Sequence, residues 1–457
     1  MIQIHDIKNN IKSQLGELWW YSIVLFFSQR LGDIINIYIG LWLVPKFVPM
    51  EQLGALLPLT QLAGFIGLPL AIILTPFIKF ISTFSAQGEE GKVKVMLRDV
   101  AFILAISSIV IGLLTWRSAS FFFERLRVDS RLLIWILVGI TVTTLVTSVT
   151  NGALSGLKKF RLMGITGFGS VLLKLIVLLL LLPINGLLGY FSSQFAANLL
   201  MCVLFCWGIR KLFSSTVKPV SYYGHWKEMV MYTLPFVLIT GVSTLGVTIQ
   251  YMIIRQRLPE IESAAFYFCS RFSEIPNMIW GAIGCVFFTI ISNAHETQQH
   301  TRKILVNVLM VSVVGGGIIA LILGLSMPWL FEQVAIWSPY RPYAYLVGWL
   351  AFTNVFRVGF ACFMSYELAC RRFSFLWYQT PIVIAEFSFL ISFTGYAFFY
   401  PYLPSEWVDW MASLRIARIN NIVMVYFVTS LLTFCISLVQ LWIEHRKGPS
   451  YKEEVPL

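Results

Sequence analysis

The stretch from Trp19 to Val44 combines two properties that constrain the whole chain: it is long and apolar enough to cross a bilayer as one helix, and it carries charge in its middle. A spanning helix needs about 20 residues at a rise of about 1.5 Å each. Read at helical spacing, Gln29, Asp33 and Asn36 fall on one strip, and Arg30 lies beside it. A guanidinium at mid-membrane costs about 3 kcal/mol on insertion scales. We therefore expect other helices to surround this strip with a hydrated or charge-paired interior.

The chain has the composition of a polytopic membrane protein. Of its 457 residues, 58% are hydrophobic and 12% charged, whereas about 25% of the residues of a soluble domain are charged. The first eighteen residues are polar and contain no cleavable signal peptide, so the first span is expected to act as its own insertion signal. Hydropathy predicts about twelve spans, near 19–44, 52–82, 99–116, 132–154, 162–183, 186–209, 229–254, 263–291, 304–327, 344–368, 376–400 and 420–443.

The basic residues set the expected orientation. The formal net charge is +12, but Lys and Arg lie in short loops between spans, so we expect no nucleic-acid partner. These residues are about twice as frequent on the side that holds both termini, which predicts that both termini are cytoplasmic.

The two halves of the chain match each other in hydropathy and loop length at a shift of 210 residues. This repeat predicts an all-α membrane protein with two six-helix bundles, related by a pseudo-two-fold axis along the membrane normal. The predicted parts are an N-terminal bundle over 1–209, a cytoplasmic linker over 210–228 and a C-terminal bundle over 229–457. The linker is long enough to join two bundles that move against each other.

Two pairs of opposite charges lie inside predicted spans at the same spacing. Arg30 and Asp33 are three residues apart, as are Arg271 and Glu274, so each pair can meet on one helix face. Each pair is either a structural ion pair that fixes helix packing or part of a cavity that contacts an anion.

Two further intramembrane cations have no acid one turn away on their own helix. Arg357 shares a face with Asn354, and Lys174 stands alone in the run LLKLIVLLLLL. The Lys174 side chain can either snorkel to the membrane surface or face an internal groove.

Arginines around a membrane cavity suggest a phosphorylated substrate. A guanidinium presents a planar fork of donors that suits phosphate oxygens, so several of them would hold a diphosphate. Amide side chains at Gln29, Asn36, Gln61 and Asn354 would then contact sugars, although the more common role of such a side chain is a helix–helix hydrogen bond.

The motifs of energy-converting and catalytic sites are missing from the sequence. We find no Gly-rich phosphate loop with a Lys-Ser/Thr ending, no His pair at metal-binding spacing and no Ser-His-Asp set. We therefore expect no enzyme activity, no metal and no cofactor, and we expect the drive to come from an H⁺ or Na⁺ gradient, the membrane potential or substrate supply.

Three segments resemble bacterial polysaccharide flippases of the MOP superfamily (multidrug, oligosaccharidyl-lipid and polysaccharide exporters). They are NGALSGLKKFRLMGITGFGSVLLKLIVLLLL from Asn151, LVPKFVPMEQLGALLPL after the first span, and SAQGEEGKVKVML after the second. The resemblance implies a V-shaped pair of bundles around a cationic cavity. It also implies export of an undecaprenyl-diphosphate-linked oligosaccharide across the bacterial inner membrane for O-antigen, capsule or exopolysaccharide synthesis, alongside a polymerase and a chain-length regulator.

The resemblance also assigns residues. Arg30, Asp33 and Arg271 match cavity positions of the related lipid II flippases. Those proteins have an arginine in the second span, where the nearest candidate here is Gln61. This departure favours the polysaccharide branch over a lipid II substrate.

Three other functions remain open. A multidrug antiporter of the same superfamily would need an acidic cavity, for which Asp33 and Glu386 are candidates. A polysaccharide polymerase or ligase would carry a large external catalytic loop, which the sequence does not show. A non-transporting scaffold would tolerate loss of Arg30, Arg271 and Arg357.

Overall fold

The computed structural model of the chain divides into two units, Met1–Met252 and Ile253–Leu457, each described here by itself. The described residues are 28, 30–64, 67, 77, 80–81, 83–84, 87–126, 130–156, 159–214, 218–229, 231, 247–248, 250–252, 254–256, 258–278, 280, 287, 291, 301–370, 375–394 and 419–446. All regular secondary structure within these ranges is helical.

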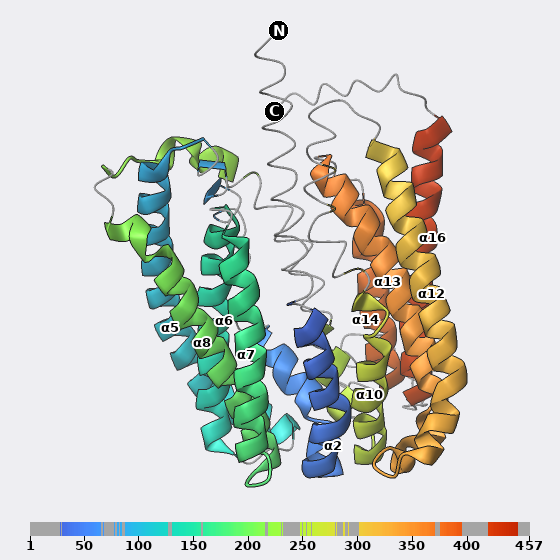
Figure 1. The fold of residues 1–457 in the computed structure, drawn as a ribbon. Coiled ribbons are helices and arrows are strands. Elements are labelled where there is room, and N and C mark those ends of the chain that lie inside the picture. The colour runs from blue at the N-terminus through green and yellow to red at the C-terminus, as the bar shows by residue number, and fades with distance from the viewer. Residues whose placement is uncertain are drawn as a thin grey trace, which may run out of the picture. The chain divides into compact units, whose positions relative to one another are not determined.

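Four long helices hold most of the described residues of the first unit: α5 (Glu90–Leu126), α6 (Arg131–Gly156), α7 (Phe160–Leu181) and α8 (Gly186–Ser214). Figure 1 shows them side by side, with α8 packed against both α6 and α7. Their surfaces are apolar nearly all round, as expected for helices that face lipid on one side and neighbouring helices on the other.

The described part of the first span is a helix over residues 30–38 that continues through η1 (Ile39–Leu43) and α2 (Val44–Phe47). η1 is a π-helical turn, and Pro45 explains its position. Proline has no N–H for the carbonyl of Leu41 and its ring would clash with it, so the turn before it widens. The short helix α3 (Met50–Leu53) and a helical segment over 56–64 follow.

The second unit contains α10 (Glu260–Ser273), α12 (Thr301–Gln333), η3 (Ser338–Tyr343), α13 (Tyr345–Ala369), α14 (Leu376–Thr394) and α16 (Ile419–Arg446). Helix α13 packs against α10, α12 and α16, and α14 also packs against α16. Gly324 and Gly348 allow α12 and α13 to approach closely, because a Cβ on Gly348 would lie 3.0 Å from the Gly324 Cα.

Seven helices in the described part of the chain are long and apolar enough to cross a membrane: Glu90–Arg117, Leu132–Asn151, Arg161–Leu181, Gly186–Arg210, Ile304–Gln333, Tyr345–Ala369 and Ile419–Ile443. Each coincides with a predicted span. The other five predicted spans lie partly outside the described residues. The all-helical membrane fold expected from the sequence is thus confirmed.

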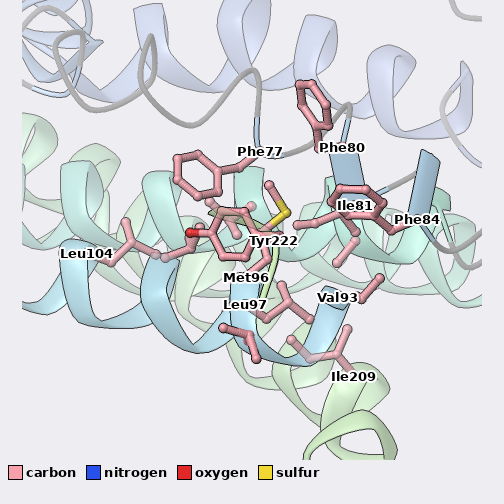
Figure 2. Close-up of a cluster of buried hydrophobic side chains, with 14 of the residues drawn as sticks. Phe77, Phe80, Ile81, Phe84, Val93, Met96, Leu97, Leu104, Ile209 and Tyr222 are labelled. Atoms are coloured by element: carbon pink, nitrogen blue, oxygen red, sulfur yellow. The ribbon is translucent and has the colours of Figure 1, made fainter. Parts of the chain in front are cut away.

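After α8 the chain returns across the start of α5 in a segment that we call the strap, residues 218–229, which includes η2 (Tyr223–His225). The Val220 N–H donates to the Gly91 carbonyl at 3.3 Å. Tyr222 is buried in the apolar cluster of Figure 2, where its ring lies among side chains that include Phe77, Met96 and Leu97. The predicted linker at 210–228 therefore contains the last residues of α8 and most of the strap; its role as a boundary between two bundles stays a prediction.

The close approach of the strap to α5 predicts a cost for any side chain at Gly91. A Cβ there would lie 2.5 Å from the backbone oxygen of Lys218. We expect Gly91→Ala to lower the melting temperature of the detergent-solubilised protein, corresponding to about 1–3 kcal/mol of overpacking strain.

Gly112→Ala is the matched control in the same helix, because the nearest atom to its Cβ is Val138 Cγ1 at 3.9 Å. Helix propensity alone favours alanine at both positions. Equal melting temperatures for the two variants would contradict the packing of the strap against α5.

Candidate functional site

The first charged pair lies on the helix over residues 30–38. The Arg30 Nη1 atom is 2.9 Å from Asp33 Oδ2. The two side chains differ in access, since Arg30 is 17% exposed and Asp33 is 42% exposed. The acid is therefore the more accessible member of the pair.

Lys174 of α7 reaches the same helix one turn further along. Its Nζ atom donates to Asn36 Oδ1 at 3.1 Å and lies 5.4 Å from the centre of the Tyr190 ring. The side chain is 9% exposed, so it points into the unit and does not snorkel. Gly32 faces α7, since a Cβ there would lie 3.4 Å from Val171 Cγ2 of that helix, an ordinary van der Waals distance.

We call Arg30, Asp33, Asn36, Lys174 and Tyr190 the unit-1 charged cluster. Its charged side chains are two cations, Arg30 and Lys174, and one carboxylate, Asp33. The amide oxygen of Asn36 and the electron-rich face of Tyr190 stabilise the ammonium. Guanidinium and ammonium groups gathered in this way are the kind of donors that bind an anion.

Two further amide residues are predicted beside this cluster. Gln29 lies outside the described residues. Gln61 is half-buried in the helical segment over 56–64, and it has no hydrogen bond to the cluster among the described residues.

The second unit contains the other predicted pair, at the end of α10. Arg271 Nη1 donates to both carboxylate oxygens of Glu274, at 3.3 and 3.1 Å, and the guanidinium lies over the Tyr267 ring at 5.3 Å. Both charged side chains are partly exposed. Asn354 of α13 does not contact them; it donates to the Ser273 carbonyl at 2.7 Å and to its hydroxyl at 3.0 Å, which ties α13 to α10.

Arg357 has a carboxylate partner that spacing along its own helix did not reveal. Its Nη2 atom lies 3.6 Å from Glu386 Oε1 of α14, and its Nε donates to Ser430 Oγ of α16 at 3.2 Å. The guanidinium also lies over the Tyr426 ring at 5.2 Å. The sequence showed no acid one turn away on the same helix, and the acid that pairs with Arg357 comes from another helix.

The predicted site residues of the second unit form two ion pairs, Arg271–Glu274 and Arg357–Glu386, each with one cation and one carboxylate. The predicted site residues of the unit-1 charged cluster include two cations, Arg30 and Lys174, and one carboxylate, Asp33.

Asp99 is a polar residue that the sequence reasoning missed. Its Oδ1 accepts two hydrogen bonds from Arg98, and its Oδ2 accepts one each from the Tyr222 and Tyr223 hydroxyls, at 3.3 and 2.9 Å. Burial and the nearby Asp99 carboxylate raise the pKa of Tyr222, so this phenol stays protonated and donates at neutral pH. A pair of adjacent tyrosines in a basic segment was the available sequence signal.

Metal-binding chemistry finds no support within the described ranges. No group of three or more His, Cys, Asp or Glu side chains is arranged there to hold an ion.

The contact between Lys174 and Asn36 predicts strong energetic coupling. We expect Asn36→Leu to lower the melting temperature, because the buried ammonium loses an acceptor; such losses cost about 1–3 kcal/mol. The double variant Asn36→Leu with Lys174→Met should recover much of that loss, giving a coupling of about 1 kcal/mol or more in a double-mutant cycle.

Lys174→Met combined with Asn354→Leu is the control cycle, because Asn354 bonds within the other unit. Its two effects should add. Additivity in both cycles would contradict the Lys174–Asn36 contact.

The Arg357–Glu386 pair makes an analogous prediction. Glu386→Gln or Arg357→Gln alone leaves one charge without its counter-ion and should destabilise the protein by about 3–5 kcal/mol if the pair is fully buried, and by less here because Arg357 is partly exposed. The double variant should melt above either single variant. A double variant that melts below both would show that the two side chains do not compensate each other.

Comparison with known proteins places the fold. No family model matches the chain, and no curated protein matches it. An inward-facing multidrug resistance MATE family transporter of the MOP superfamily has 12% sequence identity and a TM-score of 0.64, over 93% of this chain and 99% of that chain.

Two further solved structures agree. A mutant of the Vibrio cholerae MATE transporter VcmN has 14% identity and a TM-score of 0.60, over 96% of this chain and 98% of that one. The MATE transporter ClbM in complex with Rb⁺ has 14% identity and a TM-score of 0.56, over 93% and 92%. At these identities the likeness concerns the fold alone: the chain has the fold of MATE transporters of the MOP superfamily.

Proposed function

We propose that this protein is a membrane transporter that moves an undecaprenyl-diphosphate-linked oligosaccharide from the cytoplasmic to the outer leaflet by alternating access. The fold supports transport in general. The observation that supports an anionic substrate is the unit-1 charged cluster, in which Arg30 and Lys174 supply two cations at the helix over residues 30–38.

The geometry of Arg30 suits a diphosphate. Its guanidinium is a planar fork of N–H donors, and its Nη1 atom contacts Asp33. Asp33 is the more exposed partner, so an incoming phosphate can take its place or bind beside it without unfolding the helix. Water is scarce at this depth, which makes each charge-assisted hydrogen bond stronger than it is at a protein surface.

Lys174 contributes a fixed point charge. Asn36 and Tyr190 hold its ammonium inside the unit, where the cation raises the local potential without a flexible side chain having to be ordered first. Asn36 also keeps its amide N–H₂ group for a sugar hydroxyl, since only its oxygen accepts from Lys174.

The second unit would contact the glycan part of the substrate. The Arg271–Glu274 pair is neutral and partly exposed, and its donors and acceptors suit hydroxyl groups. In this proposal Arg357, Asn354 and Gln61 are further polar positions along the path, and Gln29 completes the strip that the sequence predicts. The coupling ion, H⁺ or Na⁺, the pathway polymerase and the chain-length regulator belong to the same proposal, as does the bacterial inner membrane.

A multidrug antiporter is the second candidate. The multidrug resistance transporter that shares this fold supports it, and so does Asp33, whose exposed carboxylate is the kind of group that an organic cation would seek. Arg30 and Lys174 oppose it, because a cationic drug that approached Asp33 would be repelled by these two cations. Enzyme activity has less support, since the solved structures of this fold are transporters by name.

Arg30→Ala tests the proposal. In proteoliposomes carrying a fluorescent lipid-diphosphate oligosaccharide, we expect the initial rate of translocation to fall by about 10–100-fold, as for loss of a charge-assisted contact. Arg30→Lys should retain part of the rate.

Arg271→Ala makes a second test in cells. When this variant replaces the wild type in a deletion strain, we expect surface glycan to be lost while membrane insertion of the protein is unchanged.

Arg117→Ala is the matched control, an exposed arginine near the far end of α5. Full restoration of surface glycan by Arg30→Ala would refute the assigned site. Export of a cationic dye, driven by Na⁺ or H⁺ and unaffected by Arg30→Ala, would instead support the antiporter.

A further inference from the structure

A cavity of about 420 Å³ lies between the strap and α5, apart from the charged cluster. Its walls are Phe77, Phe102 and Ile103 on one hand and Tyr222, Tyr223 and Trp226 of the strap on the other, with Arg98 and Asp99 at its polar end. It lies where α5 changes from a polar first part, which includes Glu90 and Arg98, to an apolar run. Such a boundary, lined by Tyr and Trp, is typical of a membrane–water interface.

The polar end of this cavity presents the N–H donors of Arg98. Asp99 already accepts four hydrogen bonds, two from Arg98 and one from each strap tyrosine, which fills the capacity of a carboxylate. Arg98 is 68% exposed, and the N–H groups of its guanidinium that do not face Asp99 remain as donors. With the carboxylate already saturated by donors, these N–H groups suit the oxygens of a phosphate.

The apolar end of the cavity continues onto an open face of α5. Phe102 is 67% exposed, and Ile106, Ile109 and Leu113 are exposed at the helical spacing that places them on the same face. The distance from Phe102 to Leu113 along the helix is about 16 Å. This matches the length of most of an acyl chain.

We propose that the cavity binds one anionic glycerophospholipid. Its phosphate contacts Arg98, its glycerol region fills the space between Tyr223 and Trp226, and one acyl chain lies along α5 from Phe102 to Leu113. The lipid thereby fastens the strap to α5 from the outside, as Tyr222 does from the inside. This site does not depend on which substrate the protein transports.

Native mass spectrometry of the detergent-solubilised protein, titrated with phosphatidylglycerol, tests the site. We expect one lipid to bind more tightly than the rest, and Arg98→Gln to weaken that binding about tenfold. Arg117→Gln, which changes another exposed arginine of the same helix, should leave it intact. Equal binding by the two variants would overturn the proposal.

Two further arms separate the chemistry. Phosphatidylcholine should compete poorly; binding as tight as that of phosphatidylglycerol would show recognition of the choline by the aromatic rings and overturn the anionic assignment. Inorganic phosphate at millimolar concentration should not displace the lipid, because it lacks the acyl contacts; complete displacement would show a simple anion site.

Phe102→Ala should weaken lipid binding more than Leu113→Ala, since Phe102 lines both the cavity and the acyl path.

Arg98→Gln should melt close to the wild type in lipid-free detergent, because an exposed ion pair contributes little. The wild type should gain more thermal stability on adding phosphatidylglycerol than Arg98→Gln does. An identical gain in both proteins would also contradict the site.

Discussion

The contact between Lys174 and the first span is the constraint on which the first unit depends. An ammonium in an apolar run such as LLKLIVLLLLL either reaches the membrane surface or finds polar partners inside the protein. Here Asn36 and Tyr190 supply those partners, and they come from the helix over residues 30–38 and from α8. The buried charge thus requires three helices to meet at one place.

The sequence predicted contacts within a helix better than contacts between helices. The spacing of Arg30 to Asp33 and of Arg271 to Glu274 placed each pair on one face, and both ion pairs are present. The Arg357–Glu386 pair joins α13 to α14, so no spacing rule along one helix could reveal it. The same holds for Lys174, whose environment depends on which helices pack against α7. Long apolar runs fixed the spans because hydropathy is a local property, whereas the partners of a charge are set by the tertiary fold.

The partners of the intramembrane cations distinguish residues that the sequence alone does not distinguish. The four cations predicted inside the membrane look alike in the sequence, yet Arg271 and Arg357 each lie beside a carboxylate in the second unit, whereas in the first unit Arg30 lies beside Asp33 and Lys174 contacts Asn36 and Tyr190. Pairing lowers the cost of burial and leaves little attraction for a distant anion. A group of buried side chains with more cations than carboxylates costs more free energy to bury, and it retains its attraction for an anion. The unit-1 charged cluster, whose burial costs stability, is therefore the better candidate for a functional site.

The strap is structurally part of the first unit, because its side chains pack against the start of α5. A division of the gene directly after α8 would give a first fragment that ends before Tyr222, although that ring completes the apolar cluster at the start of α5. The severed fragment would expose Phe77 and Met96 to water or lipid headgroups and leave Asp99 without its two phenol donors. Engineered split proteins, fusion points and inserted tags therefore belong on the far side of Met229, where the cluster remains whole.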